Sequence, residues 1–161
     1  MKPSLYLETT IPSFLVGTIS SVPATAVHQA ATIRWWNEQR EEYEIYISSV
    51  VIEEIQKGKT ELSRERLQLV ADYPRLVVSP DVIKLAVELQ KRLVLPARAE
   101  TDIYHVALAC HYAMDYLLSW NMKHIVNGQV IRDLTHYCDK TQTPMPILCT
   151  PYELLERSEE S

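Results

Sequence analysis

Short apolar runs of the kind that form buried β-strands alternate along this chain with longer segments of helical periodicity. The apolar runs lie at residues 5–7, 45–47, 76–78, 116–118 and 147–149. They are continuous rather than alternating with polar residues, which is typical of strands whose two faces are both covered. Because neighbouring parallel strands need a crossover of a dozen or more residues, usually a helix, the alternation predicts an α/β fold with a mainly parallel central sheet.

The segments between these runs have the spacing and the capping residues of helices. Periodicity predicts helices over residues 24–42, 50–57, 61–73, 80–95, 100–113 and 127–142. Ser48 or Ser49 is suited to cap the second of these helices, and Pro96 is expected to stop the fourth. Thr150 and Glu153 form a capping box, which indicates one more helix after the last strand.

The length of the chain indicates a single folding unit. A chain of 161 residues suits one ordinary domain and leaves little room for two. Residues 1–155 carry the alternating pattern without a linker or an internal repeat, and we expect them to form that domain. Residues 156–161 are charged and polar, and we expect them to form a frayed tail.

The composition excludes several common binding sites. With only three glycines, the chain has neither a glycine-rich dinucleotide fingerprint nor a Walker phosphate loop. Cys110, Cys138 and Cys149 lie far apart and form no C-x-x-C pair, so we expect buried free thiols rather than a structural zinc site. The formal net charge of −5 argues against a protein that coats polyanions non-specifically.

The cysteine usage and the hydropathy pattern both bear on location. The odd number of scattered cysteines is typical of a reducing compartment. The N-terminal sequence MKPSLYLETTIP is too polar for a signal peptide, and no segment approaches the roughly 18–20 apolar residues of a membrane-spanning helix. We therefore expect a soluble cytoplasmic protein that does not contact a membrane.

Polar side chains stand at the expected strand ends, where ligands bind in open parallel sheets. Glu8 directly follows the first apolar run, and Asn121 follows the fourth. Glu54, with Glu53 as the near alternative, lies in the helix after the second run, and Asp102 lies near the start of the helix that precedes the fourth. Clustered carboxylates repel one another unless a cation is present, and an all-oxygen set favours Mg²⁺ or Mn²⁺ over Zn²⁺. Such a site suits phosphodiester cleavage.

The candidates lie in four stretches of the sequence, which are YLETT (6–10), SSVVIEEIQKG (48–58), TDIYHVALA (101–109) and DYLLSWNMKHI (115–125). In this order they resemble the acidic-motif regions of PIN-domain nucleases, and most closely those of the VapC-type toxin ribonucleases of toxin–antitoxin pairs. The ending ILCTPYELL (147–155) also resembles one bacterial branch of this family. The resemblance spans most of the chain and implies a three-layer sandwich around the parallel sheet.

The resemblance assigns a role to each candidate. Glu8, Glu54 and Asp102 match the first, second and third acids of the family, and Asn121 matches the fourth position, with Ser119 as its accompanying hydroxyl residue. In the family these groups hold Mg²⁺ or Mn²⁺ for the cleavage of single-stranded RNA.

Two of these positions depart from the family pattern. Glu8 stands where an aspartate is usual, and its extra methylene moves the carboxylate outward by about 1.5 Å. Asn121 stands where an aspartate is frequent; it keeps an oxygen but lacks the negative charge, which weakens cation binding.

Each candidate also has a purely structural interpretation. Glu8 is suited to cap the segment that begins at Thr10, and Glu54 to lie on a solvated helix face. Asp102 is suited to interact with a helix dipole, and Asn121 to make a turn after the strand.

Neighbouring residues are open to similar alternatives. Thr9 and Ser119 can orient water or phosphate, or simply cap a turn. His105 follows the third acid by three residues, and we interpret it as a core histidine or as support for a ligand, rather than as a ligand itself. Lys123 and His124 are placed to touch phosphate, although solvent exposure alone accounts for both.

Two functions follow from these observations. The first is a metal-dependent ribonuclease acting on RNA, with an antitoxin protein as its partner if it is a toxin. A homodimer is a further expectation from the resemblance, for which the helix face of Val27, Ile33 and Trp36 is a candidate, although a core role is as well supported. The second is a catalytically weak or inactive binding module that keeps the fold, which the Glu8 and Asn121 departures favour.

Overall fold

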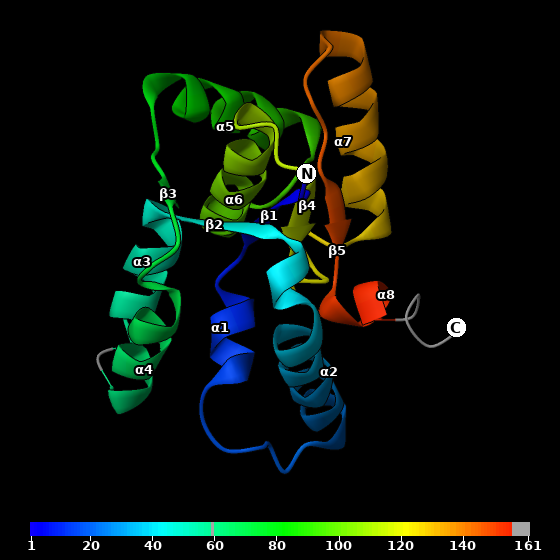
Figure 1. Cartoon of the computed structure of the whole chain (residues 1–161). Coiled ribbons are helices and arrows are strands. Elements are labelled where there is room, and N and C mark those ends of the chain that lie inside the picture. Colours follow the sequence, from blue (N-terminus) through cyan, green and yellow to red (C-terminus); the bar gives the residue numbers. More distant parts are fainter. Residues whose placement is uncertain (59, 156–161) are drawn as a thin grey trace.

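A five-stranded parallel sheet forms the centre of the protein (Figure 1). The computed structural model describes residues 1–58 and 60–155, so the tail expected at 156–161 lies outside the described residues. The strand order is β3-β2-β1-β4-β5, and every neighbouring pair is parallel. The strands are Ser4–Leu7 (β1), Glu44–Ser48 (β2), Arg75–Leu76 (β3), Tyr116–Leu118 (β4) and Ile147–Cys149 (β5). The predicted α/β fold with a parallel central sheet is confirmed.

Helices connect all of these strands. They are Thr10–Leu15 (α1), Pro23–Gln39 (α2), Ser49–Gln56 (α3), Glu61–Val70 (α4), Pro80–Arg92 (α5), Glu100–His111 (α6), Gly128–Thr141 (α7) and Pro151–Leu155 (α8), with 3₁₀ turns at Arg40–Glu42 (η1) and Ala97–Ala99 (η2). Ser48 rather than Ser49 caps α3, because its hydroxyl accepts the backbone N–H of Val51. The capping box of α8 is present, since the Glu153 carboxylate accepts the backbone N–H of Thr150.

The structure adds one helix to the predicted elements and corrects the ends of two others. The six-residue helix α1 is additional, and it accommodates Pro12 in its first turn, where a missing N–H breaks no helical hydrogen bond. α5 ends at Arg92 instead of residue 95, because Pro96 disfavours helical geometry at the residue before it and Val94 adopts a left-handed φ of 49°. β3 stops at Leu76, and the Val77 carbonyl accepts the Tyr112 hydroxyl at 2.8 Å.

The connections place helices on both sides of the sheet. Figure 1 shows α1 and α2 on one side and α5, α6 and α7 on the other. From β1 the chain moves outward to β2 and β3, and then returns across the sheet to β4 and β5. The strand order therefore reverses between β1 and β4, and the carboxyl ends of these two strands form the switch point at which open α/β sheets bind ligands.

The sheet and the inner helix faces share one buried core. Leu5, Leu7, Leu117 and Leu118 are fully buried, as expected for strands that are covered on both sides. The three cysteines are buried free thiols, which confirms the prediction for them. Of the helix face considered for a dimer, Trp36 is buried whereas Val27 is 55% exposed. Among the described residues, no helix combines the length and the apolar character needed to cross a membrane.

Candidate active site

The first residues beyond β1 and β4 meet at the switch point. The Glu8 N–H donates to the Leu118 carbonyl at 3.1 Å, which extends the pairing of the two strands by one residue. The Ser119 hydroxyl donates to Glu8 Oε1 at 2.8 Å. The candidate first acid and the hydroxyl residue of the fourth motif, 111 positions apart in the sequence, are thus in direct contact.

Glu8 is a buried carboxylate with one oxygen held by the protein. Glu8 is only 3% exposed. Thr10 donates two hydrogen bonds to Glu8 Oε1, from its hydroxyl at 2.6 Å and from its backbone N–H at 3.0 Å. Burial raises the pKa of Glu8; the charge of His105 and the hydrogen bonds from Thr10 and Ser119 oppose that rise without cancelling it. Among the described residues, Oε2 has only a long 3.3 Å contact with the Thr10 N–H, so this oxygen is available to a ligand.

Glu54 reaches the same edge of the sheet from α3. Its Oε1 accepts the Thr9 hydroxyl at 2.6 Å and lies 2.5 Å from His105 Nε2. Burial acts to raise the pKa of Glu54, but the hydrogen bond and the charge of His105 outweigh it, and the pKa is lowered. Glu54 is therefore held as a carboxylate. The alternative acid, Glu53, is exposed.

His105 connects Glu54 to the core. It is fully buried on α6, and its Nδ1 lies 2.6 Å from the Tyr6 hydroxyl, which in turn lies 2.7 Å from the Ser48 hydroxyl. Burial acts to lower the pKa of His105, but the hydrogen bond to Glu54 and the charges of Glu8, Glu54 and Asp102 raise it above the usual value. Both ring nitrogens are bonded to protein groups, so His105 supports Glu54 and is not a free metal ligand.

Asp102 and Asn121 are joined through His124. Asp102 lies in the first turn of α6, and its Oδ2 is 2.9 Å from His124 Nδ1. Asn121 Oδ1 accepts the backbone N–H of His124 at 2.9 Å, and the Asn121 N–H donates to the Ser119 hydroxyl at 2.9 Å. The Asn121 oxygen therefore makes a turn contact, as the structural interpretation of this residue expects.

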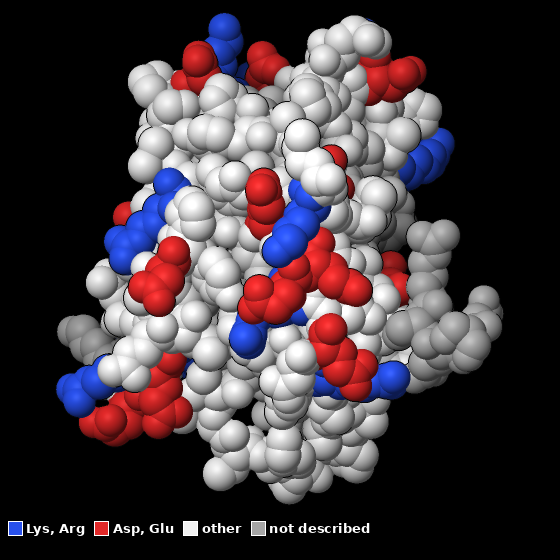
Figure 2. Space-filling view, viewed as in Figure 1, with Lys and Arg blue, Asp and Glu red and all other residues white. Residues whose placement is uncertain are grey.

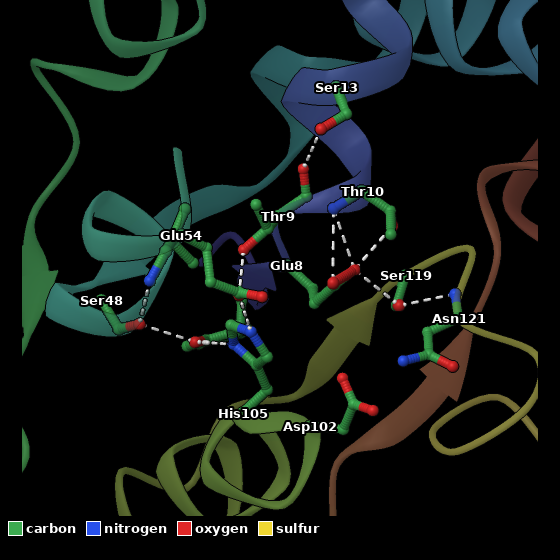
Figure 3. A network of polar contacts seen from close by, with 12 residues as sticks. Glu8, Thr9, Thr10, Ser13, Ser48, Glu54, Asp102, His105, Ser119 and Asn121 are labelled. Atoms are coloured by element: carbon green, nitrogen blue, oxygen red, sulfur yellow. Dashed lines mark hydrogen bonds and ion pairs between the residues drawn. The ribbon is translucent and has the colours of Figure 1, made fainter. Parts of the chain in front are cut away.

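Figure 3 shows the four predicted site residues around one edge of the sheet. Glu8 and Asn121 share the Ser119 hydroxyl, whereas Glu54 and Asp102 each contact a different histidine. The charges of three acids, Glu8, Glu54 and Asp102, all act to raise the pKa of the buried His105. No hydrogen bond or ion pair joins any two of the four candidates directly within residues 1–58 and 60–155.

The donor chemistry of this edge fits a hard divalent cation. Glu8 Oε2 accepts only the long contact from Thr10, and the second carboxylate oxygens of Glu54 and Asp102 accept no hydrogen bond from any described residue. In the described part of the chain, no group of three or more His, Cys, Asp or Glu side chains is close enough to form a preformed metal centre. Mg²⁺ usually keeps several waters and needs only one or two carboxylates, so these oxygens remain suitable ligands.

A groove of about 560 Å³ opens beside Glu54. Glu54 forms part of its wall, together with Lys57, Tyr104, Glu53 and Glu100. Figure 2 shows acidic and basic side chains interspersed on this view of the surface, rather than gathered into a continuous basic stripe. The groove thus combines an aromatic side chain and one cation with several acids, so a polyanion bound there needs further positive charge.

Thr10 also belongs to the site, although the sequence indicates only that a capped segment begins there. Its hydroxyl donates to Glu8 and accepts the backbone N–H of Trp120 at 2.9 Å, so it connects the ends of β1 and β4. The run of two hydroxyl residues directly after Glu8 is the sequence signal that could have identified it. His124, which the sequence places near a phosphate, instead contacts Asp102, and no sequence pattern indicates this pairing across 22 positions.

The fold is similar to that of a solved structure. That structure is the crystal structure of VapBC2 from Rickettsia felis bound to a DNA fragment from their promoter. The similarity covers 91% of this chain and 97% of the matched chain, with a TM-score of 0.57 and 18% sequence identity. No protein-family model and no curated protein matches the sequence. At this identity the likeness shows the fold, and the PIN-like α/β sandwich expected from the motifs is confirmed.

Proposed function

We propose that this protein is a metal-dependent endoribonuclease that hydrolyses phosphodiester bonds in RNA. One observation carries the proposal: Glu8, Glu54 and Asp102 arrive from β1, α3 and α6 at the switch point, and each keeps a carboxylate oxygen that the described protein leaves available. A PIN-like fold and the order of the four motifs support the same activity.

The three carboxylates share one role in this proposal, and neighbouring side chains orient them. Glu8, Glu54 and Asp102 hold Mg²⁺ or Mn²⁺, which when bound lowers the pKa of a water and neutralises charge on the phosphate. Thr9 and His105 fix the direction of the Glu54 carboxylate, and Thr10 and Ser119 fix that of Glu8. Asn121 belongs to the same site and completes or orients the shell of the ion.

The groove beside Glu54 is the proposed path of the RNA strand. Lys57 can contact a phosphate there, and the half-buried ring of Tyr104 offers an apolar surface to a base. Glu53 and Glu100 lie in the same wall, and their negative charges repel phosphate. RNA binding in the groove should therefore depend on the bound cation, which offsets this repulsion.

Cleavage of single-stranded RNA in the presence of Mn²⁺ tests the proposal directly. We expect the wild-type protein to cleave, and Asp102→Ala and Glu54→Ala each to lose at least about 100-fold in rate, because preorganised charge at the reacting phosphate contributes on that scale. Asp139→Ala is a matched control, since this exposed aspartate lies near the end of α7 that precedes β5. Cleavage that survives Asp102→Ala contradicts the assignment.

A binding module without activity is the second candidate. It is favoured by the pairing of Glu54 and Asp102 with histidines and by the commitment of the Asn121 oxygen to a backbone N–H. Calorimetric titration with Mn²⁺ separates the two candidates. Saturable binding that Glu54→Ala abolishes supports the nuclease, whereas no binding at millimolar Mn²⁺ supports the module.

The biological role that we propose is that of a toxin restrained by an antitoxin. The motif resemblance supports it, and so does the similarity of fold to the VapBC2 structure. A small open reading frame beside this gene, whose product binds the protein and stops RNA cleavage, is the expected finding. A homodimer is part of the same proposal and is tested by sedimentation of the purified protein.

A further inference from the structure

We propose that Asn121 and His124 are positioning residues, which hold Asp102 in the orientation that the proposed nuclease site requires. This inference rests on the proposed function and assigns to Asn121 an orienting role in place of metal ligation. It follows from one chain of contacts in which Asn121 fixes His124 and His124 fixes Asp102.

The first step is the anchoring of His124 by the turn after β4. Asn121 Oδ1 accepts the His124 N–H, while the Asn121 carbonyl accepts the N–H groups of Ile125 at 3.1 Å and of Val126 at 2.8 Å. The Asn121 N–H is itself bonded to Ser119, whose hydroxyl contacts Glu8. The turn is therefore fixed to the edge of the sheet, and the His124 side chain is only 13% exposed.

The second step is the contact between His124 and Asp102. A carboxylate only accepts hydrogen bonds, so His124 Nδ1 carries the proton and donates to Asp102 Oδ2 over 2.9 Å. Without this donor, the 21% exposed side chain of Asp102 can adopt other rotamers. With it, Oδ2 is held and Oδ1 is left for a ligand, which is how groups behind a metal ligand commonly orient it.

The same geometry explains why an amide suffices at position 121. The role requires one oxygen that accepts a backbone N–H, and the amide and the carboxylate provide that oxygen equally well. A negative charge at this position is not needed for the capping contact. We therefore expect Asn121→Asp to keep the orientation of His124, and Asn121→Ala to lose it.

The decisive comparison is between two substitutions of His124, measured by Mn²⁺ calorimetry. His124→Asn keeps an N–H donor close to the position of Nδ1, whereas His124→Leu removes the donor but preserves much of the volume. We expect the Mn²⁺ dissociation constant to rise by about 10–100-fold in His124→Leu and to stay within about threefold of wild type in His124→Asn. His136→Leu, the same change at an exposed site on α7, should leave it unchanged.

Crystal structures of the two His124 variants provide a readout that does not need activity. The Asp102 carboxylate should keep its orientation in His124→Asn and leave it in His124→Leu. If wild-type protein neither binds Mn²⁺ nor cleaves RNA, the proposed function fails and these structures alone decide the positioning role. An Asp102 orientation that is the same in both variants overturns the inference, as does Mn²⁺ binding by His124→Leu that equals wild type.

Discussion

His105 Nε2 lies 2.5 Å from Glu54 Oε1, and this pair joins α6 to α3 across the candidate site. The imidazole is fully buried, whereas the Glu54 side chain is 28% exposed. Each partner holds the other in its charged form, because the pKa of His105 is raised and the pKa of Glu54 is lowered. The pair is thus a structural feature of the fold, and its effect on stability can be measured as a function of pH.

Replacing His105 by glutamine should remove the charge while keeping a donor toward Glu54. We expect a loss of about 1 kcal/mol in the free energy of unfolding near pH 6, because the hydrogen bond to the Glu54 carboxylate remains but its donor no longer carries a charge. Since the folded-state pKa of His105 is raised, its contribution is complete below the unfolded value of about 6.5 and is lost as the pH rises through the folded value. Glu54, whose pKa is lowered, stabilises the folded state fully above about pH 4.5, and this stabilisation is lost as the pH falls through its folded-state pKa.

Urea unfolding of wild type and His105→Gln between pH 5 and 9 measures this difference. The two stability curves should approach each other at the alkaline end. A difference between them that stays constant over the whole range contradicts a charged His105.

Replacing Glu8 by glutamine should separate stability from activity. Burial raises the pKa of Glu8, so the ionised carboxylate opposes folding increasingly as the pH rises above about 4.5. Glutamine keeps an oxygen for Thr10 and Ser119 but carries no charge. We expect Glu8→Gln to be no less stable than wild type at pH 5, to gain on it toward pH 8, and to lose at least about 100-fold in RNA cleavage.

Thermal unfolding at pH 5 and pH 8, together with the cleavage assay, checks this prediction. Ser119→Ala is the companion variant, since it keeps the charge of Glu8 and removes a buried donor. It should be less stable than wild type at pH 8. A Glu8→Gln protein that is less stable than wild type at pH 8 would contradict the view that burial destabilises the ionised Glu8 carboxylate.

Thr32 should stabilise the wall behind the site through Trp120. The Trp120 Nε1–H donates to the Thr32 hydroxyl at 2.7 Å, and the indole stacks on His28 with a centroid distance of 4.1 Å. Thr32→Val leaves this buried N–H without an acceptor, at a cost of about 1–3 kcal/mol. The melting temperature should fall by about 2–4 °C for each kcal/mol in a chain of this size.

Thr135→Val is the matched control for this change. The Thr135 hydroxyl also donates to the carbonyl four residues earlier, as that of Thr32 does, but it is exposed. Its melting temperature should stay close to wild type by calorimetry. Equal losses in the two variants would contradict a special role for the Trp120 contact.

The sequence predicted the strands that are buried on both faces and the edge of the sheet at which the four candidate residues lie. The runs at 5–7 and 116–118 lie within β1 and β4, because continuous apolar residues are typical of strands covered on both faces. Val77 was misassigned to a strand since its apolarity is the same inside or outside one, and in the structure it is 60% exposed. The helix α1 was missed because six residues are too few to establish a helical period.

The roles of the side chains at the site were harder to predict than their positions. Sequence spacing placed Asn121 at the correct edge of the sheet, but it carries no information about which atom its oxygen meets. That contact depends on the turn that returns His124 toward α6, and on the crossover that brings Asp102 there. Pairings of this kind, across 22 or 51 positions, are properties of the tertiary structure.

Mn²⁺ should raise the melting temperature of the wild-type protein, because an ion that binds only the folded state stabilises it by mass action. At a concentration 100 times the dissociation constant the expected gain is about 2.7 kcal/mol. Asp102→Asn should lose most of this gain, since it removes a charge from the proposed shell while keeping an acceptor for His124. Asp139→Asn, at an exposed position on α7, should keep it. Excess EDTA should return the wild-type protein to its metal-free value, and a shift of equal size in Asp102→Asn would place the ion elsewhere on the molecule.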